Sequence, residues 1–144
     1  MKKRNKVILV EDNFGEAQLT RIAFEDQQIP SEIIHCEDGE KFLALLSRPN
    51  APLNEINYIL LDLNMPRIGG IEVLKKVGRH HFWCHLPIIV FTSSCHESDV
   101  LKCYELGAKA YVLKPIDFEQ FQASVQAIDN LWGHWNTFPQ LPAA

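Results

Sequence analysis

The chain alternates between short apolar runs and longer segments in which polar and apolar residues are mixed. Four apolar runs of strand length cover residues 7–10, 58–61, 88–91 and 110–113, and a fifth, which a histidine interrupts, covers residues 33–36. Unbroken apolar runs are typical of strands that are covered on both faces, as in a parallel sheet. The pattern therefore predicts five buried strands, of which the first begins at Lys6.

The segments between these runs have the features of amphipathic helices. Capping residues stand where the predicted helices begin: Asn13 with Glu16, Asp38, Ser94 with Glu97, and Asp117 with Gln120. The inward face of the first helix is predicted to consist of Leu19, Ile22, Ala23 and Ile29. Gly78 and Gly107 are placed to end the third and fourth helices. This alternation predicts an α/β fold, a doubly wound (βα)5 domain whose parallel sheet carries helices on both faces.

Reactive side chains follow four of the predicted strands. Glu11 and Asp12 follow the first strand, Asp62 follows the third, and Thr92 and Lys114 end the fourth and follow the fifth. The carboxyl ends of parallel strands lie at one edge of the sheet, where open α/β sheets bind their ligands. An acidic pair at a single strand end is often only a solvated loop or a helix cap. Its recurrence on neighbouring strands favours one common site.

The three acids are predicted to bind a metal ion, and one of them, Asp62, is predicted to react with phosphorus. If Glu11, Asp12 and Asp62 lay within a few ångströms of one another, their negative charges would repel. A hard divalent cation with oxygen ligands, above all Mg²⁺, removes that repulsion. Asp62 stands alone on its strand and can act as the nucleophile that forms an acyl phosphate. Lys114 and the Thr92 hydroxyl would then bind the new phosphate oxygens.

Composition and charge indicate an ordinary single domain. The 144 residues are 47% apolar and 22% charged, as in soluble globular proteins. A net charge of −4 gives no electrostatic reason to expect nucleic acid as a partner. The apolar segment behind the basic start is too short for a signal peptide or a membrane span. We therefore expect a cytoplasmic protein that does not enter a membrane. It would have a solvated leader at residues 1–5, a core at residues 6–130 and an aromatic extension at residues 131–144.

The cysteines and histidines offer a competing metal site. The four cysteines lie too far apart for a C-x-x-C pair, and without a secretion signal we expect them to be reduced. A tighter group could in principle bind zinc: His80, His81, Cys84 and His85. Since no second ligand pair with suitable spacing stands elsewhere, a surface loop is the preferred interpretation of this group.

Aromatic residues continue the apolar face of the last predicted helix toward the chain end. Apolar residues recur at steps of three and four: Phe118, Phe121, Val125, Ile128, Trp132 and Trp135. Packing on the sheet can explain Phe121, Val125 and Ile128, but the two tryptophans follow after the sheet is complete. We therefore predict a homodimer contact that includes Trp132, Trp135 and Phe138.

The residues at the strand ends resemble those of a known family, the response-regulator receiver domains of two-component signalling. The family's acidic pair is matched by Val10-Glu11-Asp12-Asn13, and its phosphoacceptor motif by Leu61-Asp62-Leu63-Asn64-Met65-Pro66. Thr92-Ser93 and Leu113-Lys114-Pro115 resemble its switch hydroxyl and its lysine motif. The D-L-N-M-P wording and the tryptophan-bearing tail are similar to regulators paired with cyanobacterial phytochrome kinases.

The resemblance implies a fold, a reaction and a partner. The implied fold is flavodoxin-like, with strand order 2-1-3-4-5. The implied reaction is transfer of a phosphoryl group from a sensor histidine kinase, here a bacterial phytochrome, to Asp62. Mg²⁺, for which Mn²⁺ could substitute, would be bound by Asp12, Asp62 and the Asn64 backbone carbonyl, with Glu11 acting directly or through water. The protein would be a phosphoacceptor for signalling, not an enzyme with a separate substrate.

The resemblance also implies a switch. Tyr111 would turn inward when Thr92 moves toward the phosphate, and this would change the surface made by the fourth helix, fifth strand and fifth helix. The peptide between Lys114 and Pro115 is often cis in the family, a state that proline makes accessible.

Three other functions share parts of this pattern. A phosphohydrolase of the haloacid-dehalogenase type would need a second aspartate where Asn64 stands. A flavodoxin-like electron carrier would need a glycine- and hydroxyl-rich phosphate loop in place of Glu11-Asp12. A receiver-like interaction module that no longer takes phosphate would keep the fold without the reaction.

Overall fold

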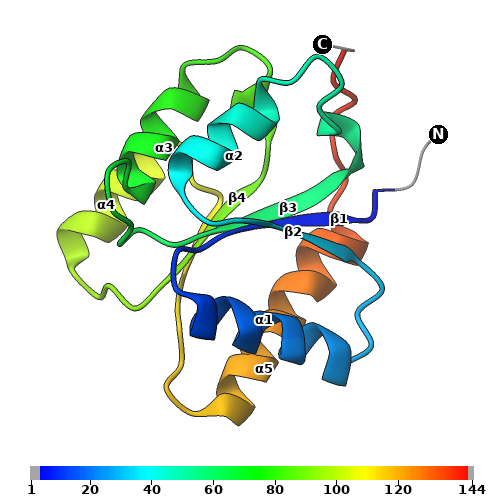
Figure 1. The fold of residues 1–144 in the computed structure, drawn as a ribbon, viewed down its shortest axis with the longest axis vertical. Coiled ribbons are helices and arrows are strands. Elements are labelled where there is room, and N and C mark those ends of the chain that lie inside the picture. Colours follow the sequence, from blue (N-terminus) through cyan, green and yellow to red (C-terminus); the bar gives the residue numbers. More distant parts are fainter. Residues whose placement is uncertain (1–3, 143–144) are drawn as a thin grey trace.

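The central element is a five-stranded parallel sheet with the order β2-β1-β3-β4-β5 (Figure 1). The computed structural model describes residues 4–142. The strands are β1 Lys6–Val10, β2 Glu32–Cys36, β3 Ile56–Leu61, β4 Ile88–Thr92 and β5 Ala110–Leu113. This order confirms the flavodoxin-like arrangement, in which the direction of chain progress reverses beside β1.

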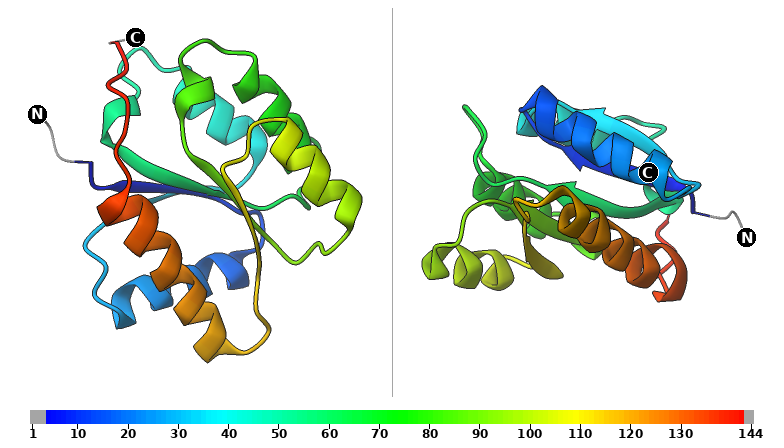
Figure 2. Two further views of the ribbon diagram at one scale, coloured as in Figure 1. Left: turned by 180° about the vertical axis from the view of Figure 1, so that it is seen from behind. Right: turned by 90° about the horizontal axis from the view of Figure 1, so that it is seen from below.

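Helices cover both faces of the sheet (Figures 1 and 2). They are α1 Phe14–Asp26, α2 Gly39–Leu46, α3 Gly70–Gly78, α4 Glu97–Glu105 and α5 Phe118–Asp129. Figure 1 shows α1 and α5 on one face and α2, α3 and α4 on the other. The prediction of a doubly wound α/β domain is confirmed.

The strands have unbroken apolar sequences because each one serves two cores. In β1, Ile8 and Val10 lie in the core under α2, α3 and α4, whereas Val7 and Leu9 lie in the core under α1 and α5. All six residues of β3 are buried. Alternate side chains point to opposite faces of a strand, so a sheet that is covered on both sides needs apolar residues at every position.

Three of the four predicted caps are confirmed. The Asn13 side chain accepts a hydrogen bond from the Glu16 backbone N–H at 3.0 Å, and Asp38 and Asp117 cap α2 and α5 in the same way. The cap predicted at Ser94 is wrong, because α4 begins only at Glu97 and His96 precedes it without a side-chain cap. The Ser94 hydroxyl instead donates to the Asp99 carboxylate at 2.7 Å.

The predicted inward face of α1 is partly wrong. Leu19 is 39% exposed, and the buried positions are Ala17, Thr20, Ala23 and Phe24. Thr20 can be buried because its hydroxyl donates to the Glu16 carbonyl within the helix at 3.2 Å. A polar residue with a partner inside its own helix is therefore part of the packed face, which hydrophobic periodicity alone does not reveal.

The chain end folds back onto the amino-terminal end of β3. After α5, residues Asn130–Trp135 form a π-helical turn, and the chain then runs past the short 3₁₀ helix Leu53–Glu55. Asn54 exchanges two hydrogen bonds with the backbone of Leu141, at 2.7 and 2.9 Å. Leu141 is buried in the core under α2, α3 and α4. Residues 131–142 of the extension are thus part of the folded domain.

Arg4 bonds residues of the folded domain, including residues near the carboxyl end of the chain. The prediction of a solvated leader is therefore wrong at this residue. Its guanidinium donates to the carbonyls of Leu53, Ile56 and Pro139, and lies 4.4 Å from the centre of the Phe138 ring. The leader residues 1–3 lie outside the described part of the chain. Within residues 4–142, no helix has both the length and the apolar character that a membrane crossing requires.

A buried carboxylate organises the turn after α5. Asp129 is 2% exposed, accepts a hydrogen bond from the buried Tyr58 hydroxyl at 3.0 Å, and lies 3.2 Å from His134. A Cβ at Gly133 would lie 2.6 Å from the Asp129 carboxylate, so a side chain at this position would have to displace that buried group. Trp132 packs on the core under α1 and α5, whereas Trp135 is 82% exposed. The two tryptophans therefore lie in different environments, with Trp132 against the core and Trp135 on the surface.

Candidate functional site

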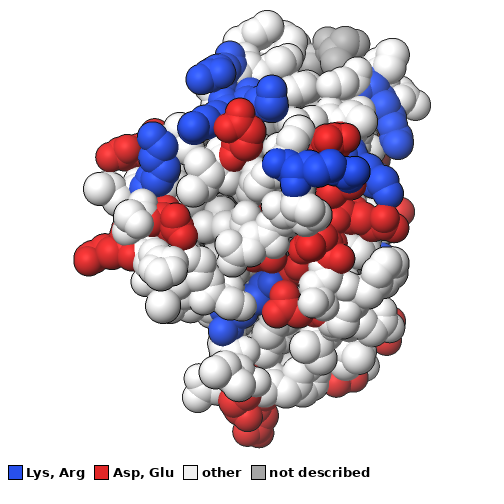
Figure 3. All heavy atoms as spheres, turned by 60° about the vertical axis from the view of Figure 1, so that its left-hand side comes forward, with Lys and Arg blue, Asp and Glu red and all other residues white. Residues whose placement is uncertain are grey.

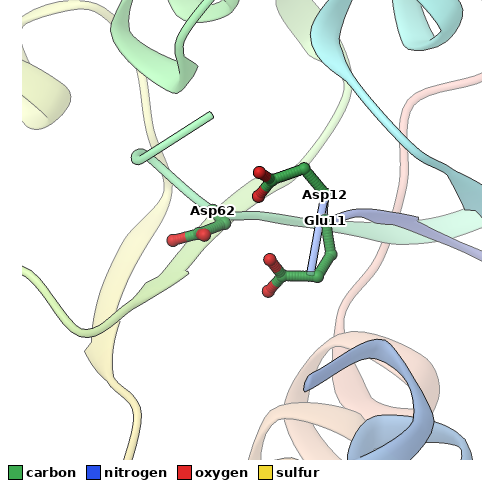
Figure 4. A group of neighbouring side chains, drawn as sticks. All are labelled: Glu11, Asp12 and Asp62. Atoms are coloured by element: carbon green, nitrogen blue, oxygen red, sulfur yellow. The ribbon is translucent and has the colours of Figure 1, made fainter. Parts of the chain in front are cut away.

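Three carboxylates meet at the carboxyl ends of β1 and β3 (Figure 4). One oxygen from each of Glu11, Asp12 and Asp62 lies within 4.8 Å of the others. The register explains the meeting, because Val10 of β1 pairs with Leu61 of β3. Glu11 and Asp62 are 2% and 7% exposed, whereas Asp12 is open to solvent. The prediction that these acids share one edge of the sheet is correct.

Backbone hydrogen bonds orient the two buried acids. The Leu63 N–H donates to Asp62 Oδ1 at 2.9 Å, which leaves Oδ2 on the side of Lys114. The Asn13 N–H donates to Glu11 Oε2 at 3.2 Å. Each carboxylate therefore has one oxygen fixed by the main chain and one directed toward other side chains.

Lys114 enters the site from the end of β5 and is 6% exposed at its side chain. Its ammonium donates to Glu11 Oε1 at 2.5 Å and to Glu16 Oε2 at 2.8 Å, and lies 4.0 Å from Asp62 Oδ2. Burial acts to lower the pKa of Lys114, but the hydrogen bonds and the negative charges around it outweigh burial and raise it. Lys114 is therefore a charged cation inside a group of acids.

Burial has the opposite effect on Glu11. It raises the pKa of the Glu11 carboxyl to about 7, although the hydrogen bond from Lys114 acts to lower it and nearby Asp62 to raise it further. A carboxyl group with so high a pKa is stabilised in its charged form by any additional cation. A positive ion bound next to Glu11 would therefore lower this pKa.

Glu16 belongs to the site and was not predicted to do so. The spacing from Asn13 predicts a capping box, in which the Glu16 side chain would return to the Asn13 backbone. The backbone half of that motif is present, but the carboxylate reaches Lys114 instead. The signal in the sequence was an acid in the first turn of α1, close to the carboxyl end of β1.

Thr92 and Tyr111 are connected through one residue of the loop after β4. Thr92 is fully buried, and its hydroxyl oxygen accepts a hydrogen bond from the Ser94 N–H at 3.3 Å. The half-buried Tyr111 donates its hydroxyl to the Ser94 carbonyl at 2.8 Å. Burial raises the pKa of Tyr111. The peptide between Lys114 and Pro115 is trans, so the cis form that the family resemblance implies is not present.

The alternative zinc site is not supported. The His80 ring stacks between His81 and Trp83, and its Nδ1 atom accepts hydrogen bonds from the backbone N–H groups of Phe82 and Trp83. Within residues 4–142, the acids described above are the one group of three or more potential ligands that lies close enough to hold a metal ion. The four cysteines are free, as predicted.

The surface over the carboxyl ends of the strands carries both signs of charge. Figure 3 shows acidic side chains gathered in the middle of this face, with basic side chains at several places around them. Asn64 follows Asp62 on the exposed loop after β3. The donors here are oxygen atoms, which suit a hard divalent cation such as Mg²⁺ or Mn²⁺.

A comparison with family models matches residues 7–126 to the response regulator receiver domain. The chain belongs to this family. The receiver domain is 32% identical over 135 residues to the response regulator Rcp1 of Synechocystis sp., covering 92% of both chains. It is 31% identical over 134 residues to a probable methanogenesis regulatory protein, FilR2, of Methanothrix harundinacea, covering 92% of this chain and 86% of the relative.

Solved structures agree with this assignment. The phosphorylated cyanobacterial phytochrome response regulator RcpA has a TM-score of 0.85 and 29% identity, over 95% of this chain and 99% of the other. The Mn²⁺-bound form of Rcp1 has a TM-score of 0.84 and 31% identity, over 94% and 99%. The protein is thus a response regulator of two-component signalling. Receiver domains bind a divalent metal ion, as the Mn²⁺-bound form of Rcp1 does, and the group of three acids found here is of a type that can hold such an ion.

Proposed function

We propose that this receiver domain accepts a phosphoryl group on Asp62 from a sensor histidine kinase. One observation carries the proposal: a buried carboxylate at the end of β3 lies 4.0 Å from a buried ammonium and beside two further acids. In the transfer, the bond between phosphorus and the kinase's histidine nitrogen breaks, and a bond forms between phosphorus and Asp62 Oδ2. The electron pair of the broken bond stays on the histidine ring, which then binds a proton.

The neighbouring side chains have separate roles in this proposal. Leu63 holds Asp62 Oδ1 through its N–H group, so that Oδ2 faces the incoming phosphorus. Lys114 supplies positive charge to the phosphoryl oxygens, and the Thr92 hydroxyl donates a hydrogen bond to another. Asp12, Glu11, Asp62 and the Asn64 backbone carbonyl would hold Mg²⁺ or Mn²⁺. The bound ion supplies charge neutralisation between the acids and the phosphoryl group.

The response is carried by the loop after β4. A phosphoryl group adds nearly two negative charges beside Lys114 and Thr92. If the Thr92 hydroxyl turns toward it, the hydrogen bond from the Ser94 N–H is lost, and Ser94 also holds Tyr111. Movement of this loop changes the surface formed by α4, β5 and α5, which is a two-state element biased by a local charge.

The reaction is tested with a small acyl phosphate and Mg²⁺, followed by intact-mass measurement. The native protein is expected to gain about 80 Da, and Asp62→Asn is expected to gain nothing, because its amide is not a nucleophile. A native protein without an adduct would instead favour a receiver-like module that has lost the reaction. Continuous release of phosphate from added phosphate esters would favour a hydrolase.

Names of similar proteins suggest the class of kinase. RcpA is described as a cyanobacterial phytochrome response regulator, and the 35% identical AtBRR, with a TM-score of 0.73, as a bacteriophytochrome response regulator. These likenesses cover 95% and 96% of the chain. A bacterial phytochrome is accordingly the kinase that we expect to phosphorylate Asp62.

Homodimerisation is the proposed output, with Trp135 at its centre. Trp132 and Phe138, which were predicted to share this contact, are partly used inside the domain by the core and by Arg4. Trp135 and Leu131 are 82% and 53% exposed on the same turn. An exposed tryptophan beside a second apolar residue is a typical interface anchor.

Sedimentation velocity tests the dimer. Trp135→Ser is expected to weaken self-association by at least about tenfold, because a central interface tryptophan commonly contributes more than 1.4 kcal/mol, which is about tenfold in affinity. Thr137→Ser serves as a control at a nearby exposed position. A native protein that is monomeric with and without the phosphoryl analogue beryllofluoride would rule out this output.

A further inference from the structure

Lys114 has more negative partners than the proposed reaction requires. Glu11 and Asp62 follow strands β1 and β3, whereas Glu16 lies in the first turn of α1 and belongs to none of the motifs that carry the family resemblance. Its carboxylate bonds the ammonium at 2.8 Å, while Asp62 Oδ2 lies beyond hydrogen-bond distance at 4.0 Å. Lys114 is therefore hydrogen-bonded to Glu11 and Glu16 and not to the phosphoacceptor.

The two acids that bond Lys114 differ in how firmly they are held. Glu11 is 2% exposed at its side chain, accepts a second hydrogen bond from the Asn13 backbone, and also faces Asp12 and Asp62. The Glu16 side chain is 36% exposed, and its Oε2 atom accepts a hydrogen bond from Lys114. Glu16 is consequently the partner that gives up its hydrogen bond with Lys114 at the lower cost, because its carboxylate can turn into solvent.

We propose that Glu16 is a positioning residue that competes with the phosphoryl group for Lys114. The proposal rests on phosphorylation of Asp62 as described above. While Glu16 holds the ammonium, part of the positive charge is neutralised before phosphorus arrives. A phosphoryl group on Asp62 must then attract Lys114 against this partner, and Glu16 sets how strongly the site binds its anion.

Substitution of Glu16 by glutamine tests this competition without disturbing the N-terminal cap of α1. The cap of α1 uses the Asn13 side chain and the backbone N–H of residue 16, and both remain in Glu16→Gln. The change removes one negative charge next to Lys114 and leaves the acids at the strand ends in place. Beryllofluoride, in the presence of saturating Mg²⁺, is the probe. Its binding is followed by NMR at the Leu63 amide, which bonds Asp62 Oδ1.

The expected result is tighter binding in the variant. The beryllofluoride concentration that half-saturates the site should be about threefold to tenfold lower in Glu16→Gln than in the native protein. This is the effect expected for removing one negative charge several ångströms from an anion in a partly exposed site. Glu16→Asp keeps the charge, but its side chain is one methylene too short to hold Lys114 in the same place. It should therefore also bind the probe more tightly than the native protein. Glu119→Gln removes an exposed acid from the first turn of α5 and should bind like the native protein.

Several outcomes would overturn the proposal. Unchanged or weaker binding in Glu16→Gln would show that Glu16 does not compete for Lys114. Equal tightening in Glu16→Gln and Glu119→Gln, with native binding in Glu16→Asp, would show a general effect of charge without positioning. Both results leave phosphorylation of Asp62 intact. Failure of the native protein to bind beryllofluoride, with Leu63 unaffected, would remove the proposed function and this inference together.

Discussion

Lys114→Met should lower the free energy of unfolding by about 3 kcal/mol at pH 8, the cost of removing one member of a buried charge group. Methionine is similar in length to lysine, so the change removes the charge with little loss of packing. Glu11, which is 2% exposed in the native protein, would lose its cation while Asp62 and Glu16 stay nearby. The loss follows from uncompensated negative charge in a buried place.

This loss should depend on pH. The pKa of Glu11 is raised from its ordinary 4.5 to about 7 even with Lys114 present, and removal of the ammonium raises it further. Between pH 4.5 and the folded-state pKa, the folded variant binds a proton that the unfolded chain has released. Stability therefore falls as the pH rises through this window, and the variant should be closer to the native protein at pH 5 than at pH 8.

Urea unfolding at the two pH values measures this difference. Lys76→Met, which removes an exposed lysine from α3, is the matched control and should change stability by less than about 0.5 kcal/mol. If Lys114→Met lost no more stability than this control at pH 8, the ammonium would not be compensating the buried acids. That result would remove the electrostatic account of the site.

Asp12→Asn should have opposite effects with and without Mg²⁺. Without metal, loss of one of three crowded carboxylates should raise the free energy of unfolding by about 0.5 kcal/mol, a small value because Asp12 is exposed and its repulsion is screened. With metal, the same change removes a ligand and should weaken Mg²⁺ binding by at least about tenfold. A stabilised metal-free protein that no longer responds to Mg²⁺ is the expected combination.

Thermal unfolding over a range of Mg²⁺ concentrations gives both quantities. A ligand that binds the folded state stabilises it in proportion to the logarithm of its concentration above the dissociation constant. The native protein and the control Glu25→Gln, an exposed acid of α1, should show this rise. If Asp12→Asn rose equally, Asp12 would not be a metal ligand.

The sheet and most of the site could be predicted because they depend on patterns that the backbone imposes. Buried parallel strands need apolar residues on both faces, so residues 58–61 identify β3 and place Asp62 at its end. Parallel strands then bring their carboxyl ends together without any knowledge of side-chain packing. The family's motif residues lie at these ends, which is why Glu11, Asp12 and Lys114 could be placed at one edge.

The features that the sequence did not predict are those in which one side chain has two possible partners. Glu16 could return to Asn13 as in a capping box or reach Lys114, and only the packed structure decides between them. Ser94 could cap α4 or bond Asp99, with the same uncertainty. At the chain end, Asp129 selects the turn by bonding Tyr58, a residue 71 positions away, and no local pattern reveals such a contact.

The central claim is that Asp62 carries the phosphoryl group, and chemical mapping of the adduct tests it most directly. Borohydride reduces an acyl phosphate to the corresponding alcohol, so treatment of the phosphorylated native protein marks the modified side chain before digestion and peptide sequencing by mass spectrometry. The account predicts the mark at Asp62 alone, in protein incubated with phosphodonor and Mg²⁺. A mark at Glu11 or Asp12, or none at any residue of a folded protein, would contradict it.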